Sequence, residues 1–350
     1  MRKIILKLHL YFALAGCVFV AILGLTGSIM AFEGELDRLF NPSLYSVHPE
    51  PSRLRSISAL TTLLEEKYPG AHVVGFGIAD RPDESFSAFM DNGSGVFINQ
   101  YTGEVLGTRS SATFLDYVHQ FHIRLLAGHT GQVVVGVAGI VMFLLVLTGI
   151  ILWWRYKQFS MKLNGSFVRA MFDLHTVTGI YTAVVLLFLS ATGIIISQEN
   201  SVYPWLYKIT KTQRIARSVP STPREGIVPI TADSAVTLAK NALPGANPLA
   251  VFIPSKPTQS FNVRMHFPED LTPGGRSWVC IDQYSGEVLV SQNSRTAPGP
   301  TRAEIINRAI HTGDILGLFS KIVASLSSFL VVVQALSGIL LWWKRDRKNR

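Results

Sequence analysis

Four long apolar stretches constrain what this chain of 350 residues can fold into. Each exceeds the roughly 18 residues that a helix needs to span a bilayer. They run from about Leu8 to Phe32, Gln132 to Trp154, Leu174 to Ser197 and Leu316 to Trp343. The 48% hydrophobic content fits the same picture. We therefore expect a multi-pass protein embedded in a lipid bilayer.

The first apolar stretch follows three basic residues, as the apolar part of a secretory signal peptide would. Its run is too long for such a segment, and no clear A-x-A cleavage site follows it. We therefore expect a membrane helix that is retained.

Twelve basic residues lie at helix ends that fall on one side of the membrane if four helices alternate. They are Arg2, Lys3, Lys7, Arg155, Lys157, Lys162, Arg169, Lys344, Arg345, Arg347, Lys348 and Arg350. Basic loops stay in the cytoplasm, so both termini are expected there, in the inner membrane of a bacterium. The net charge of +9 then reflects topology, and no nucleic-acid partner is expected.

This topology divides the chain into membrane, external and cytoplasmic segments. The helices are expected at 8–32, 119–154, 173–197 and 305–343, the second and fourth with periplasmic extensions. The cytoplasmic loop is 155–172 and the tail 344–350, and the periplasmic segments are 33–118 and 198–304.

A duplication organises the sequence. Residues 147–154 read LTGIILWW and residues 336–343 read LSGILLWW, an offset of 189. Residues 101–106 read YTGEVL and residues 284–289 read YSGEVL. His9 and His175 each open a run from L-H to a T-G dipeptide. Each half is therefore a helix, an external module and a helix, in the same orientation.

Both external segments have the pattern of a small α+β module. A helical pattern over 56–68 precedes strands near 71–78, 85–90 and 95–100, and one from Thr231 to Ala242 precedes strands near 249–253, 260–266 and 277–282. Gly103 and Gly286 end turns that need a positive φ. The expected fold is a membrane all-α four-helix bundle of two tandem two-helix halves, with two small α+β modules.

Four of the nine histidines form equivalent pairs in the duplication. His122 and His311 lie at external helix ends, and His9 and His175 lie at cytoplasmic ends. A single interfacial histidine is equally compatible with simple solvation, but the duplication favours a function. Two imidazoles on opposite sides of an iron ion suit a low-spin b-type haem. No C-x-x-C-H motif is present, so two non-covalent, bis-histidine haems are expected.

The remaining histidines are ranked below these four. His129 lies seven residues after His122, so we expect it on the same helical face, as the leading substitute ligand. His119 lies one turn before His122 and is a candidate contact for a propionate or a substrate. His48, His72 and His266 fall in external loops or strands, where surface roles are expected.

The chain resembles the PepSY-associated transmembrane family. The resemblance rests on the L-H…T-G helices, the T-G-I and S-G-I stretches ending in LWW, and the two units that close with Y-TGEVL and Y-SGEVL. Within that family the chain is similar to FoxB-type ferric-siderophore reductases and PiuB-like iron-regulated proteins. The resemblance implies two haems and periplasmic reduction of the iron of a ferric siderophore.

The sequence contains no G-x-G-x-x-G motif, so no NAD or FAD site is expected. Electrons are then expected from membrane quinol or from a separate reductase. The family name suggests an alternative, a regulatory protein whose modules bind a peptide or a protease and which has no redox activity. A histidine-lined metal transporter is disfavoured because no carboxylate-rich or inverted-repeat pathway supports it.

Overall fold

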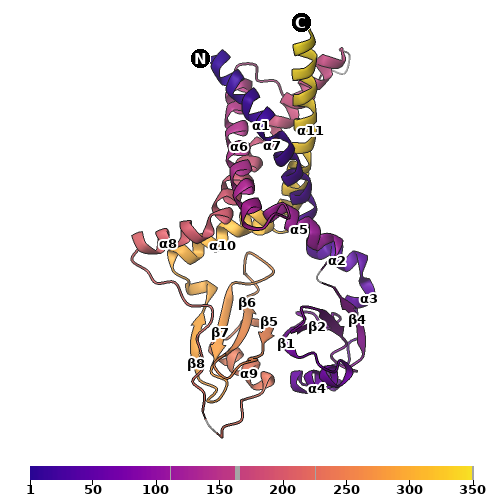
Figure 1. The fold of residues 1–350 in the computed structure, drawn as a ribbon, viewed down its shortest axis with the longest axis vertical. Coiled ribbons are helices and arrows are strands. Elements are labelled where there is room, and N and C mark those ends of the chain that lie inside the picture. The colour runs from indigo at the N-terminus through magenta and orange to yellow at the C-terminus, as the bar shows by residue number, and fades with distance from the viewer. Residues whose placement is uncertain (111, 162–165, 225, 349–350) are drawn as a thin grey trace. The chain divides into compact units, whose positions relative to one another are not determined.

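The computed structural model describes residues 1–110, 112–161, 166–224 and 226–348, with the backbone alone for 346–348. Two of the basic residues counted above, Lys162 and Arg350, lie outside the described residues. The chain forms two units (Figure 1). The membrane unit comprises residues 1–33, 114–205 and 306–350, and the sheet unit comprises residues 34–113 and 206–305.

Four helices of the membrane unit are long and apolar enough to cross a bilayer, as the sequence predicts. They are α1 (Arg2–Met30), α6 (Gly128–Trp154), α7 (Phe167–Ser197) and α11 (Leu318–Lys348). Their lengths of 27 to 31 residues exceed the about 20 that span the hydrocarbon core. Helices α1 and α7 each pack against both α6 and α11, so α1 and α7 lie diagonally.

An apolar cluster lies midway along these helices. Val20 of α1, Leu186 of α7 and Val331 of α11 are buried together, and Val141 of α6 packs against them. Small residues allow the close approach that lipid-embedded helices need. At Gly24 of α1, a Cβ atom would lie 2.6 Å from a backbone carbonyl oxygen of α11. Many outward-facing apolar side chains are exposed, as expected of a surface that contacts lipid.

Shorter helices flank the membrane helices. Helices α2 (Glu33–Phe40) and α8 (Glu199–Ile209) follow α1 and α7, while α5 (Phe114–Arg124) and α10 (Gly299–Thr312) precede α6 and α11. The chain breaks between α5 and α6, because Leu125 and Leu126 have φ angles of 48° and 55°. A residue pair in that conformation ends a right-handed helix.

The sheet unit is built on one antiparallel sheet of eight strands. The strands are β1 (Val73–Gly77), β2 (Phe86–Met90), β3 (Gly95–Ile98), β4 (Val105–Arg109), β5 (Asn247–Phe252), β6 (Phe261–His266), β7 (Ser277–Ile281) and β8 (Val288–Gln292). Their order is β4-β3-β2-β1-β5-β6-β7-β8. The sequence pattern predicts six of these strands, and the edge strands β4 and β8 lack the alternation that would indicate them.

The two segments that the sequence presents as separate modules contribute four strands each to this sheet. Strand β1 pairs with β5, with Phe76 opposite Val251. The central pairing satisfies backbone groups that would otherwise be an exposed edge on each half. The duplicated halves therefore share one sheet and one core.

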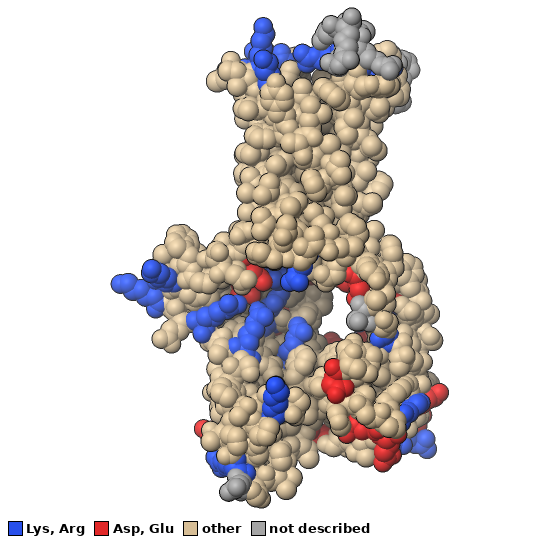
Figure 2. All heavy atoms as spheres, viewed as in Figure 1, with Lys and Arg blue, Asp and Glu red and all other residues tan. Residues whose placement is uncertain are grey.

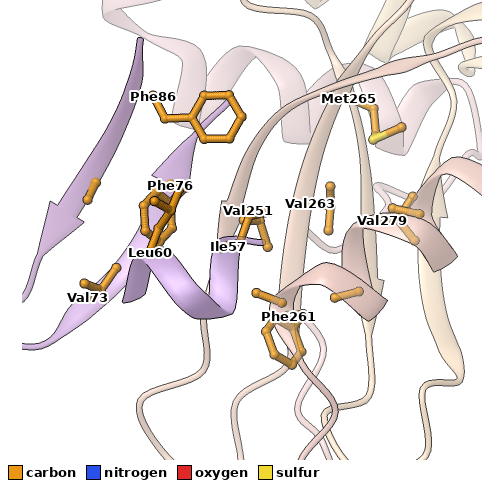
Figure 3. Close-up of a cluster of buried hydrophobic side chains, with 14 of the residues drawn as sticks. Ile57, Leu60, Val73, Phe76, Phe86, Val251, Phe261, Val263, Met265 and Val279 are labelled. Carbon is orange, nitrogen blue, oxygen red and sulfur yellow. The ribbon is translucent and has the colours of Figure 1, made fainter. Parts of the chain in front are cut away.

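Helices α4 (Ile57–Lys67) and α9 (Ala232–Ala242) supply the helical side of that core. Leu60 and Leu64 of α4 are fully buried with Phe76, and Ala235 of α9 is fully buried with Val263. Figure 3 shows the side chains of both halves in one apolar layer. Burial of large apolar side chains of this kind contributes about 1.5–3 kcal/mol each.

The predicted turns are confirmed, and the helix predicted to begin at Thr231 is capped by that residue. Thr231 accepts a hydrogen bond from the backbone N–H of Ser234 at the start of α9. Gly103 and Gly286 have φ angles of 81° and 73°, in tight turns before β4 and β8. These glycines fix the hairpins, since residues with a Cβ rarely adopt such angles.

One carboxylate ties the two halves together. Asp233, in the first turn of α9, accepts hydrogen bonds from the backbone N–H groups of Ile57 (2.7 Å) and Ser58 (3.0 Å) of α4. It also accepts one from the Ser58 hydroxyl at 2.6 Å. A negative charge at a helix N-terminus is favourable, because the first N–H groups of a helix have no partner within it.

We expect Asp233→Ala to destabilise the sheet unit by about 1–3 kcal/mol, since it leaves backbone donors of α4 unpaired at the junction. Thermal unfolding of the purified protein, followed by circular dichroism, measures the loss. Glu66→Ala, at an exposed position of α4, is the control. Equal unfolding midpoints for the two variants would contradict this role.

Candidate functional site

The structure brings His9 and His175 together near the cytoplasmic ends assigned from the sequence. His9 lies on α1 and His175 lies on α7, the diagonal helices. Their ring centroids are 6.3 Å apart, and the ring planes are at 87°. The two side chains therefore meet across the interior of the four-helix arrangement.

His122 and His311 form a second pair at the other end of the membrane unit. They lie on α5 and α10, with ring centroids 6.1 Å apart and ring planes at 44°. Burial, with the nearby His311 as a smaller cause, lowers the pKa of His122 to about 3. Burial lowers the pKa of His311 to about 4. Burial therefore favours the neutral form of both rings, which is the form that a metal ligand must have.

A hydroxyl on a neighbouring helix holds the Nδ1 atom of each of these four rings. The pairs and distances are His9 with Thr148 (2.8 Å), His122 with Thr26 (3.0 Å), His175 with Ser337 (3.1 Å) and His311 with Thr192 (3.1 Å). The partners follow the duplication, since Thr26 matches Thr192 and Thr148 matches Ser337. Each ring is thus held by a helix other than its own.

These contacts define which ring nitrogen carries the proton. The Nδ1 atoms of His175 and His311 also lie 3.0 and 3.1 Å from the carbonyl oxygens of Gln334 and Leu189. A carbonyl oxygen only accepts, so Nδ1 is the protonated donor in both rings.

The other two rings have the same arrangement. Each of the four hydroxyls donates its own proton to the carbonyl four residues earlier, at 2.6 to 2.7 Å, and so accepts from Nδ1–H. In all four rings, Nε2 is then the nitrogen that keeps a lone pair for a metal ion.

A glycine follows each of these hydroxyl residues and lies against the ring edge. A Cβ atom at Gly27 or Gly193 would lie 3.0 or 2.9 Å from Cε1 of His122 or His311. A Cβ atom at Gly149 would lie 3.6 Å from Cε1 of His9, and one at Gly338 would lie 3.3 Å from Cε1 of His175. In the sequence, the T-G and S-G dipeptides serve only as markers of the repeat. The contact of each glycine with an imidazole is a role that the sequence alone did not reveal, although the dipeptides are its signal.

The spacing of each histidine pair fits a shared metal ion. Imidazole nitrogens bind first-row metal ions at about 2 Å, so a metal between two of them places the ring centroids about 6 Å apart. The observed separations of 6.1 and 6.3 Å agree with that value. The donor set, two imidazole nitrogens, is one that haem iron accepts.

The expectation that His129 shares a helical face with His122 is wrong. Helix α5 ends at Arg124 and α6 begins at Gly128, so the two histidines lie on different helices. His129 is exposed near the start of α6. The positive φ angles at Leu125 and Leu126, which the apolar pattern does not reveal, cause this difference.

His119 pairs with a carboxylate. Its Nδ1 donates to Glu33 at 3.2 Å, and this hydrogen bond raises the pKa of His119. The equivalent residues in the second half are Arg308 and Glu199, which form an ion pair at 3.3 Å. The duplication therefore conserves an ion-pair position and changes its cation.

The other histidines lie in the sheet unit. His48 is exposed, the Nδ1 of His72 lies 3.5 Å from Glu65, and the Nδ1 of His266 lies 2.9 Å from the Phe267 carbonyl oxygen. His72 is exposed, as expected, but the side chain of His266 is only 15% exposed and its Nε2 lies 3.5 Å from Asp80, so His266 has a structural position instead of the expected surface one.

Comparison with known families shows what kind of chain this is. Residues 6–348 match the family described as the PepSY-associated TM region, and the chain therefore belongs to that family. A search of curated proteins finds no match. Together with the four apolar helices, the match establishes a multi-pass membrane protein.

Two glycines of α7 distinguish the effect of close packing from the effect of helix propensity. Gly193→Ala tests both effects, and Gly179→Ala tests helix propensity alone. A Cβ at Gly193 would collide with His311, whereas a Cβ at Gly179 meets nothing within 4 Å. We expect Gly193→Ala to destabilise the membrane unit by about 1–3 kcal/mol through overpacking. Gly179→Ala should be neutral or stabilising by up to about 1 kcal/mol. Thermal unfolding in detergent measures both, and equal effects would contradict the ring contact.

Proposed function

We propose that this protein holds two b-type haems, one between His9 and His175 and one between His122 and His311, and carries electrons across the inner membrane to a ferric siderophore. The observation that carries the proposal is the pair of facing imidazoles at each end of the membrane unit. A haem bound by two imidazoles supplies one-electron transfer.

The residues around each histidine pair set the protonation and the environment of the two rings. Thr26, Thr148, Thr192 and Ser337 fix the ring proton on Nδ1, and this leaves the lone pair of Nε2 for a metal ion. Hydrogen bonds to the second ring nitrogen raise the basicity of a ligand and fix its tautomer. Between the two pairs, Val20, Leu186 and Val331 fill the interior with apolar side chains, which exclude water.

The direction and the acceptor rest on the resemblance to ferric-siderophore reductases and on loop charge. Basic residues at 2–7 and 155–169 indicate that the His9 and His175 end is cytoplasmic. Electrons would leave near His122 and His311. Hard oxygen ligands hold iron(III) more strongly than iron(II), so one-electron reduction releases the metal.

Membrane quinol or a separate reductase would supply the electrons. Each quinol gives two electrons and two protons on oxidation to the quinone, and this supports the reduction of two iron(III) ions. A purely regulatory, peptide-binding protein would not need four equivalent histidines whose Nδ1 atoms are hydrogen-bonded to hydroxyl groups. The redox function accounts for these histidines, so we favour it.

The absorption spectrum of the purified protein, reduced with dithionite, tests the proposal directly. We expect a Soret band and a sharp α band, with about two haems per chain. His9→Ala and His311→Ala should each remove about one haem, because each iron needs two imidazoles. His129→Ala and His48→Ala, at exposed positions, are the controls. A protein without these bands would refute the redox function, and retention of both haems in either ligand variant would refute the pairing.

Thr192→Val tests the tautomer-fixing hydroxyl. We expect haem affinity at the His122 and His311 pair to fall about tenfold or more, as it does when other ligands lose their hydrogen-bond partners. A change in midpoint potential at this site should accompany the loss, measured by spectroscopic redox titration. Thr192→Ser should behave as the natural protein does, since Ser337 takes the same role for His175.

Ser190→Ala is the matched control for Thr192→Val. Its hydroxyl donates to the Leu186 carbonyl within α7 at 2.6 Å. We expect its spectrum and potential to be unchanged. An unchanged potential and haem content in Thr192→Val would contradict the role of the hydroxyl.

A further inference from the structure

The two halves of the sheet unit have opposite charge. Residues 34–113 contain ten Asp and Glu against six Lys and Arg, whereas residues 206–305 contain seven against eleven. Figure 2 shows acidic side chains gathered over the first half and basic side chains gathered over the second. The halves share a fold, so the fold itself does not require this difference.

Part of the excess positive charge lies on the sheet face that the helices leave uncovered. Val263, Met265 and Val279 of β6 and β7 point into the core. Arg264 and Trp278 alternate with them and form a cross-strand pair on the opposite face. In the first half, the equivalent cross-strand pair is Phe89 and Gly95. An apolar and a small residue there correspond to a guanidinium and an indole in the second half.

The segment before α9 adds a second guanidinium to this face. The Ala216 carbonyl accepts a hydrogen bond from the Trp278 indole N–H at 3.3 Å, and the Arg217 carbonyl accepts one from Asn262 at 2.5 Å. These contacts hold the segment against β6 and β7. The guanidinium of Arg217 then lies 5.9 Å from the centre of the Trp278 ring.

Within the part of the chain that the structure describes, one carboxylate pairs with two arginines of this segment. Glu304 lies 3.3 Å from Arg217 and 3.9 Å from Arg214, so one carboxylate serves two guanidinium groups. Arg264 donates to a neutral acceptor, the Gly274 carbonyl, at 2.8 Å. Burial and the neighbouring Arg217 lower the pKa of Arg264, although an arginine remains charged at neutral pH. Like charges held together in this way favour a bound anion.

We propose that Arg217, Arg264 and Trp278, here called the basic face, bind the substrate and select ferric chelates that carry negative charge. The inference rests on the proposed function for the identity of the metal. Guanidinium groups bind carboxylate or catecholate oxygens through charge-assisted hydrogen bonds. The indole offers a flat apolar surface to an aromatic ring of the ligand. Neutral hydroxamate chelates lack the charge that the basic face recognises.

Gallium(III) chelates test the binding apart from the chemistry, because gallium(III) has the charge of iron(III) but is not reduced. The probes are the tris-catecholate of gallium(III), which is triply negative, and its neutral tris-acetohydroxamate. Binding to the full chain in nanodiscs of zwitterionic lipid is measured by titration calorimetry. We expect the anionic probe to bind at least about tenfold more tightly, which is about 1.4 kcal/mol. Added salt should weaken its binding.

Arg217→Gln and Arg264→Gln should each weaken the anionic probe about fivefold or more, since each removes a charge-assisted hydrogen bond. Arg264→Lys should retain part of the affinity by keeping the charge. Arg81→Gln, an exposed arginine of the first half, is the matched control and should change nothing.

Several results would overturn the inference. These are equal binding of the two probes, unchanged affinity in both glutamine variants, displacement of the probe by added inorganic phosphate, or loss of probe binding when phosphatidylglycerol replaces part of the zwitterionic lipid. Displacement by phosphate would assign the basic face to phosphate, and loss in phosphatidylglycerol would assign it to lipid headgroups. Binding of the anionic probe by a protein without haem bands would refute the redox function and leave the anion site supported. Haem bands without probe binding would refute the anion site and leave the redox function supported.

Discussion

The hydrogen bond from each Nδ1–H to a hydroxyl of a neighbouring helix is the interaction on which the membrane unit depends. A neutral imidazole inside an apolar bundle has two nitrogens to satisfy, and an unsatisfied polar group in a membrane is costly. Thr26, Thr148, Thr192 and Ser337 satisfy one nitrogen of each ring. The same bonds tie α1 to α5 and α6, and α7 to α10 and α11. One set of contacts therefore joins the helices and fixes the proton of each ring on Nδ1.

The duplication builds two kinds of symmetry from the same repeat. In the membrane unit, equivalent residues face each other across the interior, so His9 meets His175 and His122 meets His311. In the sheet unit, equivalent strands pair side by side, and β1 and β5 join two four-stranded halves into one sheet. Asp233 adds a contact between the two helices that cover that sheet. A single ancestral half would have had an open sheet edge and half a ligand set, and pairing removes both deficiencies.

Divergence between the halves marks the positions where symmetry is not required. The Glu33 and His119 pair corresponds to Glu199 and Arg308, and the Phe89 and Gly95 pair corresponds to Arg264 and Trp278. The four histidines and their hydroxyl partners thus keep the same chemistry in both halves, whereas residues at the surface of each half are free to take separate roles.

The sequence by itself determined the four membrane helices, the duplicated order of elements, the tight turns and the four histidines that pair, because each is encoded locally or by the repeat. Apolar length, the cap at Thr231 and the glycines of the tight turns need no tertiary context. Only the tertiary structure decided the features that depend on where the chain turns and on which segments pack together. It ended α5 at Arg124, which separates His129 from His122, and it paired β1 with β5. It also placed each T-G or S-G dipeptide against an imidazole, because a contact between helices has no sequence period of its own.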